Sequence, residues 1–437
     1  MRSFYDRKNE IKVLDTIEQN SLTNANFTLM PGRRRIGKTS LLKKFAEKKK
    51  CCYLFTVRTS ESLLCQEWQK KLQESLGLKI FGNITNFADL FEQIMEYSKQ
   101  NHFSLIIDEF QDLQIINPAI FSQMQNIWDS HKDESKINLI VCGSVYSMMI
   151  KIFEDSKEPL FGRASAKINL QPFTPSVCKE ILKDFNPSYT KEDLLCLYML
   201  SGGVAKYIFL LMQAGCTTKE KMIEYVTGIA SPFLIDGKDI LVSEMGKDYG
   251  IYFSILSLIS KGLTSQSEID SVIQKNTGAY LANLYKVFNV IKPIRPLYAK
   301  EGSRNARWQI TDAYLRFYFY FIYSNQSMIE LEQFDLLQKL ILRDYETFTG
   351  KTLEEYFTAK IKEGNQVSLM GGWWDKKSQN EIDIVAVNDL EKKCTIYEVK
   401  RNAEKINLAD LEKKAEIFRQ NIPDYSVELK GLSMEDM

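Results

Sequence analysis

The segment Gly32-Arg33-Arg34-Arg35-Ile36-Gly37-Lys38-Thr39 decides the fold, because it fits the phosphate-binding pattern GxxxxGK[ST]. Residues 26–30 (NFTLM) lead into it as a predicted strand, and residues 39–49 lead out as a predicted helix. The glycines let the backbone curl so that its N–H groups face phosphates, and the start of the helix adds partial positive charge. We therefore expect ATP here, with Lys38 on the β- and γ-phosphates and Thr39 on Mg²⁺.

The alternative for this segment is a glycine turn followed by a basic surface helix. If the segment does bind nucleotide, the expected contact residues within it are Gly32, Arg35, Gly37, Lys38, Thr39 and Ser40.

A second motif, Leu105-Ile106-Ile107-Asp108-Glu109, supplies the carboxylates that such a site needs. The apolar residues predict a buried strand, and Asp108 at its carboxyl end can hold the magnesium shell. Glu109 can orient and deprotonate the attacking water. Ser144, which ends the strand INLIVCGS, is expected near the γ-phosphate as a polar sensor. The alternative for Ser144 is a cap at the end of the strand.

The segments around these motifs alternate between short apolar runs and helical patterns from residue 26 to residue 170. Runs at 51–57, 103–110 and 137–144 predict buried strands, and the patterns around 61–76, 87–99 and 117–131 predict helices. This βαβ order predicts an α/β fold with a parallel sheet.

The remaining chain changes pattern several times, and the length of 437 residues corresponds to roughly three domains. Between residues 250 and 310, three predicted helices, the third at GAYLANLYKVFNVI, precede a predicted hairpin, IRPLYA–KEGSRN–ARWQIT. This is the element order of a winged helix-turn-helix. Mixed α/β patterns return near the end, with a helix expected from about residue 351. The expected domains are an ATPase core at 1–173, a helical lid at 174–248, a winged helix-turn-helix at 249–312, a helical connector at 313–349 and a nuclease-like domain at 350–437.

The last of these domains carries a spaced set of charged residues on two predicted strands. Asp383 lies in EIDIVAV, where it shares a face of the strand with Glu381. Glu398 and Lys400 lie in CTIYEVK and also share a face. Side by side in a hairpin, these strands bring the three side chains together as D…ExK, the set of restriction-endonuclease-like nucleases. The carboxylates can hold Mg²⁺, Lys400 can activate water, and Glu354 on the preceding helix can complete the metal shell. The alternative is an exposed face of alternating charges that has no catalytic role.

Several of these motifs together resemble a known family. GRRRIGKTSLL, IIDEFQDL, GSVYSMM, PLFGRA and LSGGVAKYI follow in order the pattern of archaeal-type P-loop ATPases, a branch near the AAA+ and STAND NTPases that also occurs in bacteria. The resemblance covers most of the chain, including the winged helix and a nuclease-like PD-(D/E)xK segment. It implies a strand between the P-loop strand and the Asp-Glu strand, followed by a helical lid. It also implies that Arg163 senses the γ-phosphate or acts across a subunit interface; the alternative is an ion pair that holds its loop.

The expected winged helix is locally basic, since residues 261–307 hold eight Lys and Arg against three Asp and Glu in a chain of net charge +1. Basic side chains on a wing contact phosphates and do not read sequence. The expected DNA contacts are Lys286, Lys300, Arg304 and Arg307. The alternative is a winged helix that docks on protein.

The composition and the apolar runs argue against several classes of protein. The polar N-terminus is not a secretory signal, and the longest apolar run, Tyr314 to Tyr323, is too short to span a bilayer. Eight scattered cysteines without a CxxC pair, and two histidines, leave little material for a zinc site. We expect a cytoplasmic protein with ATP and Mg²⁺ as cofactors and DNA as a partner, together with a second copy or another protein. The favoured function is an ATPase with a nuclease-like domain, and the alternative is a nucleotide-switched regulator whose C-terminal domain only binds.

Overall fold

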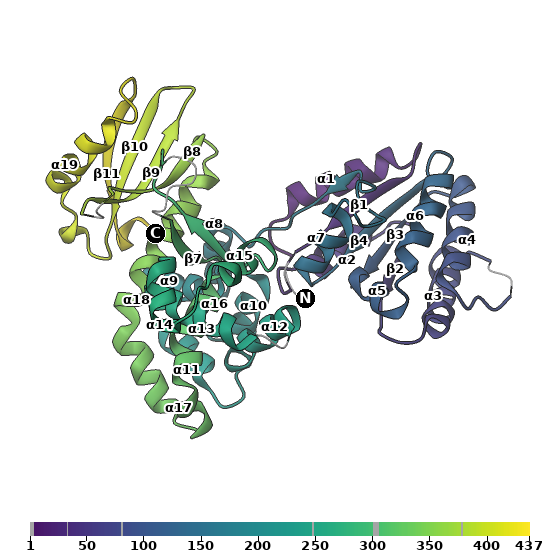
Figure 1. Ribbon diagram of the computed structural model, residues 1–437, viewed down its shortest axis with the longest axis horizontal. Helices are drawn as coiled ribbons and strands as arrows, with labels where there is room; N and C mark the ends of the chain where they lie inside the picture. Colours follow the sequence, from purple (N-terminus) through teal and green to yellow (C-terminus); the bar gives the residue numbers. More distant parts are fainter. Residues whose placement is uncertain (1–3, 33, 80–81, 247–248, 300–305, 377–378) are drawn as a thin grey trace. The chain divides into compact units, whose positions relative to one another are not determined.

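The computed structural model describes residues 4–32, 34–79, 82–246, 249–299, 306–376 and 379–437 (Figure 1). The chain forms two compact units, Met1–Gln171 and Pro172–Met437. No helix within the described ranges is both long and apolar enough to cross a membrane.

The first unit is built on a parallel five-stranded sheet in the order β2-β3-β4-β1-β5. Strand β4 lies between β1, which leads into the phosphate-binding segment, and β3, which ends at Asp108, as the family resemblance predicts. The elements of this unit are α1 (Lys8–Asn20), β1 (Asn26–Met30), α2 (Lys38–Ala46), β2 (Cys51–Phe55), α3 (Glu61–Leu76), α4 (Phe87–Gln100), β3 (Phe103–Asp108), α5 (Leu113–Ile116), α6 (Ile120–His131), β4 (Ile137–Cys142), α7 (Tyr146–Glu154) and β5 (Ala166–Lys167).

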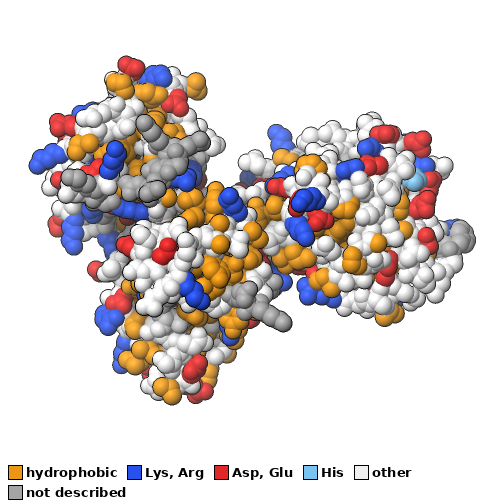
Figure 2. All heavy atoms as spheres, in the orientation of Figure 1, with side chains coloured by type: hydrophobic (Ala, Val, Ile, Leu, Met, Phe, Trp, Pro, Cys, Tyr) orange, Lys and Arg blue, Asp and Glu red, His pale blue; other side chains and the backbone are white. Residues whose placement is uncertain are grey.

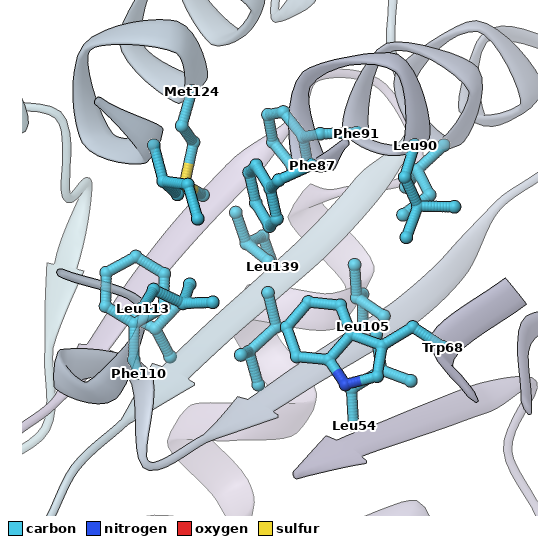
Figure 3. Close-up of a cluster of buried hydrophobic side chains, with 14 of the residues drawn as sticks. Leu54, Trp68, Phe87, Leu90, Phe91, Leu105, Phe110, Leu113, Met124 and Leu139 are labelled. Atoms are coloured by element: carbon cyan, nitrogen blue, oxygen red, sulfur yellow. The ribbon is translucent and has the colours of Figure 1, made fainter. Parts of the chain in front are cut away.

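Both faces of this sheet are covered, which explains the continuous apolar sequence of β3 and β4, every residue of which is buried. On one face, Leu54, Leu105 and Leu139 of the strands pack against α3, α4 and α6, with Trp68 and Phe87 among the buried side chains (Figure 3). On the other face, residues of α1 and α2 complete a second apolar cluster. The two layers fix the carboxyl ends of β1, β3 and β4 side by side.

The second unit begins with helices and continues with a short antiparallel hairpin, β6–β7. Three helices, α13 to α15, precede that hairpin, which is the element order expected of a winged helix. The elements are α8 (Pro175–Phe185), α9 (Lys191–Ser201), α10 (Ala205–Gln213), α11 (Lys219–Thr227), α12 (Asp236–Met245), α13 (Tyr249–Ser260), α14 (Gln266–Ile273), α15 (Gly278–Lys286), β6 (Ile291–Ile294), β7 (Arg307–Ile310), α16 (Ala313–Phe317), α17 (Gln326–Glu330) and α18 (Phe334–Glu363).

The second unit ends in a mixed four-stranded sheet in the order β11-β10-β9-β8, with α19 (Leu408–Arg419) against it (Figure 1). Its strands are β8 (Leu369–Trp374), β9 (Glu381–Asn388), β10 (Lys393–Val399) and β11 (Ser426–Leu432). β8, β9 and β10 are antiparallel neighbours, whereas β10 and β11 run parallel because α19 connects them.

Two features differ from the sequence expectation. The helix expected from about residue 351 begins at Phe334, and Gly350 lies inside it where a Cβ would meet no heavy atom within 4 Å. The strand β5 was not expected; it has only two residues and pairs with Thr28 and Leu29 of β1. Two residues are too few to leave a periodic pattern in the sequence.

Candidate nucleotide site and C-terminal carboxylate cluster

The phosphate-binding loop has the backbone that its sequence predicts. Gly37, directly before α2, has φ +102°, a conformation open to glycine, and Arg35 also has a positive φ of +79°. Lys38 begins α2, is buried, and its Nζ donates a hydrogen bond to the carbonyl oxygen of Gly32. Burial lowers the pKa of Lys38, although the acidic groups around it oppose that shift. An anionic ligand at this ammonium group would offset the cost of burying it.

Asp108 joins the loop to strand β3 and is surrounded by hydrogen-bond donors. Its Oδ2 accepts from Thr39 Oγ1 at 3.2 Å and from the hydroxyl of Tyr53 on β2. Its Oδ1 accepts from the backbone N–H of Glu109 at 2.9 Å and from Cys142 Sγ at 3.0 Å. The hydroxyl and the carboxylate that sequence analysis assigns to magnesium therefore touch each other.

Glu109 follows in a left-handed backbone conformation, with φ +53°. Three donors meet its Oε2: Gln111 Nε2 at 2.6 Å, Ser144 Oγ at 2.7 Å and Ser144 N at 3.3 Å. Among the residues that the structure describes, no donor is placed on Oε1. One carboxylate oxygen is thus fixed in place and the other is left for a water molecule.

Ser144 connects Glu109 to the phosphate-binding loop. Its hydroxyl donates to Glu109 and accepts a hydrogen bond from Arg34 Nε at 3.1 Å. Sequence analysis expected Ser144 at this site and missed Arg34, Gln111 and Tyr53. Tyr53 lies in an apolar run, Gln111 is one of several polar residues after strand β3, and Arg34 is one of three adjacent arginines, so no sequence pattern singles them out.

Arg163 lies in an ion pair. Its Nη2 is 3.0 Å from Asp129 Oδ2 of α6, and its Nη1 donates to the carbonyl oxygen of Phe161 at 2.8 Å. Burial alone raises the pKa of Asp129, but Arg163 and Lys132 outweigh it and hold that pKa below its usual range. This geometry matches the alternative in which Arg163 holds its own loop. Ser40 is exposed on α2, and Arg35 is half-buried.

The donor set fits a magnesium nucleotide. A buried ammonium group, the N–H groups of a positive-φ loop and a helix start suit phosphates. The hydroxyl of Thr39 and the carboxylate of Asp108 are hard oxygen ligands of the kind that Mg²⁺ takes together with waters and phosphates. Over the described ranges, no group of three or more His, Cys, Asp and Glu is arranged to hold a metal ion, so water and the nucleotide would have to supply the other ligands.

In the second unit, β9 and β10 bring the predicted D…ExK residues together. Lys400 Nζ lies 3.5 Å from Asp383 Oδ2 and 3.3 Å from Glu398 Oε1. Asp383 Oδ2 also accepts from Val399 N at 2.8 Å, and Glu398 Oε2 accepts from Asn407 N at 2.9 Å. Burial lowers the pKa of Lys400, but the charges of Asp383 and Glu398 outweigh burial, so the pKa lies above its ordinary value. The antiparallel register that the hairpin argument requires is present.

Glu354, on α18, stands close enough to this cluster to be affected by it. Burial raises the pKa of Glu354, the charge of Asp383 adds to that shift, and an ion pair with Lys351 opposes it. The charge of Asp383 thus acts on Glu354, while the hydrogen bond of Glu354 is made with Lys351.

The expected DNA contacts occupy different environments. Lys286 is exposed at the end of α15, and Lys300 and Arg304 lie outside the described residues. Arg307 is bound within the protein: its Nη1 is 2.8 Å from Glu381 Oε1, and its guanidinium lies 4.3 Å from the Trp374 ring centroid. On the face seen in Figure 2, Lys and Arg side chains are scattered among acidic and apolar ones.

Comparison with known proteins gives two family matches in separate parts of the chain. Residues 4–211 match a family described as an ATPase domain predominantly from Archaea, and residues 318–414 match one described as archaeal and bacterial proteins of unknown function. Among solved structures, the Walker-type ATPase of Pyrococcus abyssi is similar in fold, with a TM-score of 0.53, 20% identity, and coverage of 72% of this chain and 96% of that one.

Two proteins of Methanocaldococcus jannaschii, both named as uncharacterized, are similar in sequence. One is 35% identical over 77 residues, which is 17% of this chain and 75% of the relative. The other is 30% identical over 416 residues, which is 91% of this chain and 87% of the relative. Because that similarity extends over nearly all of both chains and the ATPase motifs meet in one site, the chain belongs to this predominantly archaeal family of P-loop ATPases.

Proposed function

We propose that the first unit binds ATP with Mg²⁺ and hydrolyses it. The observation that carries this proposal is the 3.2 Å contact between Thr39 Oγ1 and Asp108 Oδ2, because it joins the two halves of the site. The family match supports the ATPase class, and the proposal adds which residues perform each step.

The loop residues bind and orient the nucleotide. Lys38 and the N–H groups after Gly37 would neutralise and hold the β- and γ-phosphates. Thr39 and Asp108 would hold Mg²⁺, which when bound supplies positive charge to the phosphate oxygens. Tyr53 and Cys142 restrict the rotation of Asp108 through their hydrogen bonds to its two oxygens.

Glu109 is the residue placed to take a proton from the attacking water. Its Oε2 is held by Gln111 and Ser144, so its Oε1 has a fixed direction. A base of this kind contributes roughly 10²- to 10⁴-fold to the rate.

Nucleotide binding tests the first step of this proposal. Titration of a fluorescent ATP analogue should show binding to the wild-type chain and a large loss in Lys38→Ala. The matched control is Lys43→Ala, which changes an exposed lysine further along α2. Equal affinity of the Lys38→Ala variant and the wild type would contradict the proposed site.

We propose as a second activity that the C-terminal sheet cuts phosphodiester bonds with Mg²⁺ at Asp383 and Glu398. The supporting observation is Lys400, which lies within 3.5 Å of both carboxylates, where it can position or activate a water molecule. DNA is the proposed substrate, and Lys286 is a proposed phosphate contact.

Cleavage of labelled single- and double-stranded DNA with Mg²⁺ or Mn²⁺, with and without ATP, tests this activity. Cutting should be lost in Asp383→Ala and kept in Glu428→Ala, a control on the neighbouring strand β11. Undiminished cutting by Asp383→Ala would show that another site, or a contaminant, is responsible.

The alternative is a nucleotide-switched regulator in which the C-terminal sheet only binds a partner. Slow turnover, tightly retained nucleotide and no metal-dependent cleavage would support the regulator.

A further inference from the structure

We propose that Arg34, in the phosphate-binding loop, is the arginine that contacts the γ-phosphate, and that it acts within its own chain. This inference rests on the proposed ATP hydrolysis and assigns a residue that the sequence motifs do not mark. It replaces Arg163 as the arginine of the reaction.

The position of Arg34 carries the proposal. Its Nε donates to Ser144 Oγ at 3.1 Å, which brings the guanidinium to the ends of strands β3 and β4, beside Glu109. Its charge also acts on Lys38, whose ammonium group is expected at the β- and γ-phosphates. Arg34 is therefore near both the phosphate-binding lysine and the proposed base, while its side chain is exposed and accessible to a ligand.

The hydrogen bonds of Ser144 form a chain with consistent directions. The Ser144 hydroxyl has one proton, which it donates to Glu109 Oε2 at 2.7 Å, and its lone pair accepts from Arg34. Only Nε of Arg34 is used in this bond, so the two terminal amino groups of the planar guanidinium can reach a phosphate. Arg34, Ser144 and Glu109 thus link the expected γ-phosphate position to the expected base.

Three other described arginines of the first unit have partners elsewhere. Arg163 pairs with Asp129, and Arg58 makes two hydrogen bonds of 3.0 Å to Asp112. Arg7 is buried and bonds to Glu10 and to the carbonyl oxygen of Gln171. Use of any of these at the nucleotide would require an existing contact to break, whereas Arg34 already lies in the loop.

The chemistry needs such a group because negative charge is redistributed over the phosphoryl oxygens in the transition state. A guanidinium in place before the reaction stabilises that charge without reorganisation. An arginine in this role contributes on the order of 10³-fold or more to kcat. The same contact strengthens binding of a triphosphate over a diphosphate, since ADP has no γ-phosphate.

The test compares Arg34→Ala and Arg34→Lys with the rival residue in Arg163→Ala and with the control Lys43→Ala, at an exposed lysine of α2, in two measurements. The first is kcat for ATP hydrolysis, which we expect to fall by about 10³-fold in Arg34→Ala, less in Arg34→Lys and little in Arg163→Ala. The second is the ratio of affinities for ADP and a non-hydrolysable ATP analogue, which Arg34→Ala should shift toward ADP. Unchanged kcat and an unchanged ratio in Arg34→Ala, or these losses in Lys43→Ala or Arg163→Ala instead, would overturn the assignment.

The affinity ratio separates this inference from the proposed function. If the wild type hydrolyses no ATP, the proposed hydrolysis fails, yet the ratio still reports whether Arg34 contacts the γ-phosphate. Mixing Arg34→Ala with Lys38→Ala tests the second part, because each variant lacks a different residue. We expect no recovery of activity in the mixture; recovery would show that Arg34 acts on the nucleotide of another copy.

Discussion

Arg307 Nη1 lies 2.8 Å from Glu381 Oε1, so strand β7 of the hairpin is tied to strand β9, two residues before Asp383. The hairpin joins the C-terminal sheet in a second way, because Leu297 N donates to Gly372 O at 3.0 Å and the Leu297 side chain is buried in the apolar cluster of that sheet. Arg307, one of the four residues expected to contact DNA phosphates, therefore makes its contacts within the protein. The hairpin is therefore an integral part of the C-terminal half of the second unit.

The Arg307–Glu381 ion pair should contribute modestly to stability. Both side chains are partly exposed, so water screens the pair, and a coupling energy of about 1 kcal/mol or less is expected. A double-mutant cycle of Arg307→Ala and Glu381→Ala, measured by chemical unfolding, gives this value directly. A coupling of several kcal/mol would mean that the pair is far less hydrated than its exposure indicates.

Leu297 should matter more than Arg307 for stability, because its side chain is buried in the apolar cluster of the C-terminal sheet, together with Trp373. Leu297→Ala removes buried methyl groups and is expected to cost about 2–4 kcal/mol of unfolding free energy. The control is Leu390→Ala at a side chain that is 97% exposed, which should change little. Equal effects of the two substitutions would contradict the packing of the hairpin on the sheet.

Gly203 is a position where a side chain does not fit. It has φ +83°, and a Cβ there would lie 2.1 Å from the carbonyl oxygen of Phe173. Gly203→Ala should therefore cost more than the ~1 kcal/mol of left-handed backbone strain alone. Gly215 has a similar φ of +69°, and a Cβ there would meet no heavy atom within 4 Å. Gly215→Ala therefore measures the backbone strain by itself. A larger thermal destabilisation in Gly215→Ala would refute this explanation.

The contact of Glu363 with the start of α8 should make stability depend on pH. Burial raises the pKa of Glu363, but its hydrogen bonds from Ser176 N, at 2.9 Å, and Ser176 Oγ outweigh burial and leave that pKa below 4.5. A lowered folded-state pKa adds stability that is present above the unfolded value of 4.5 and is lost as pH falls through the folded value. The stability difference between wild type and Glu363→Gln should shrink as pH falls below 4.5. Glu180→Gln, at an exposed side chain, serves as the control. A difference that is constant over this range would exclude the proposed linkage.

Local patterns predicted much of the fold. Strand 26–30 and helix 61–76 have the expected bounds, because a buried run before a glycine loop and a serine-capped amphipathic segment leave clear signals. The expected start of the helix near residue 351 is wrong, because α18 begins at Phe334 and continues through Gly350, and the aromatic residues of 313–349 leave no clear boundary in the sequence.

Contacts between distant residues could not be predicted in the same way. The pairs Arg163–Asp129 and Arg307–Glu381 join residues far apart in sequence, and nothing in either local pattern selects the partner. The proximity of Asp108, Glu109 and Ser144 could be predicted from the sequence, because parallel strands end at one edge of the sheet whatever the details of packing.

The most direct test of the account measures ATP binding and ATP hydrolysis on the same preparation of the Glu109→Gln variant. Glutamine keeps the shape of the side chain but cannot accept the proton, whereas Lys38, Thr39 and Asp108 remain. The account predicts ATP affinity close to that of the wild type and hydrolysis slower by at least about 10²-fold. Hydrolysis by Glu109→Gln at the wild-type rate would contradict it.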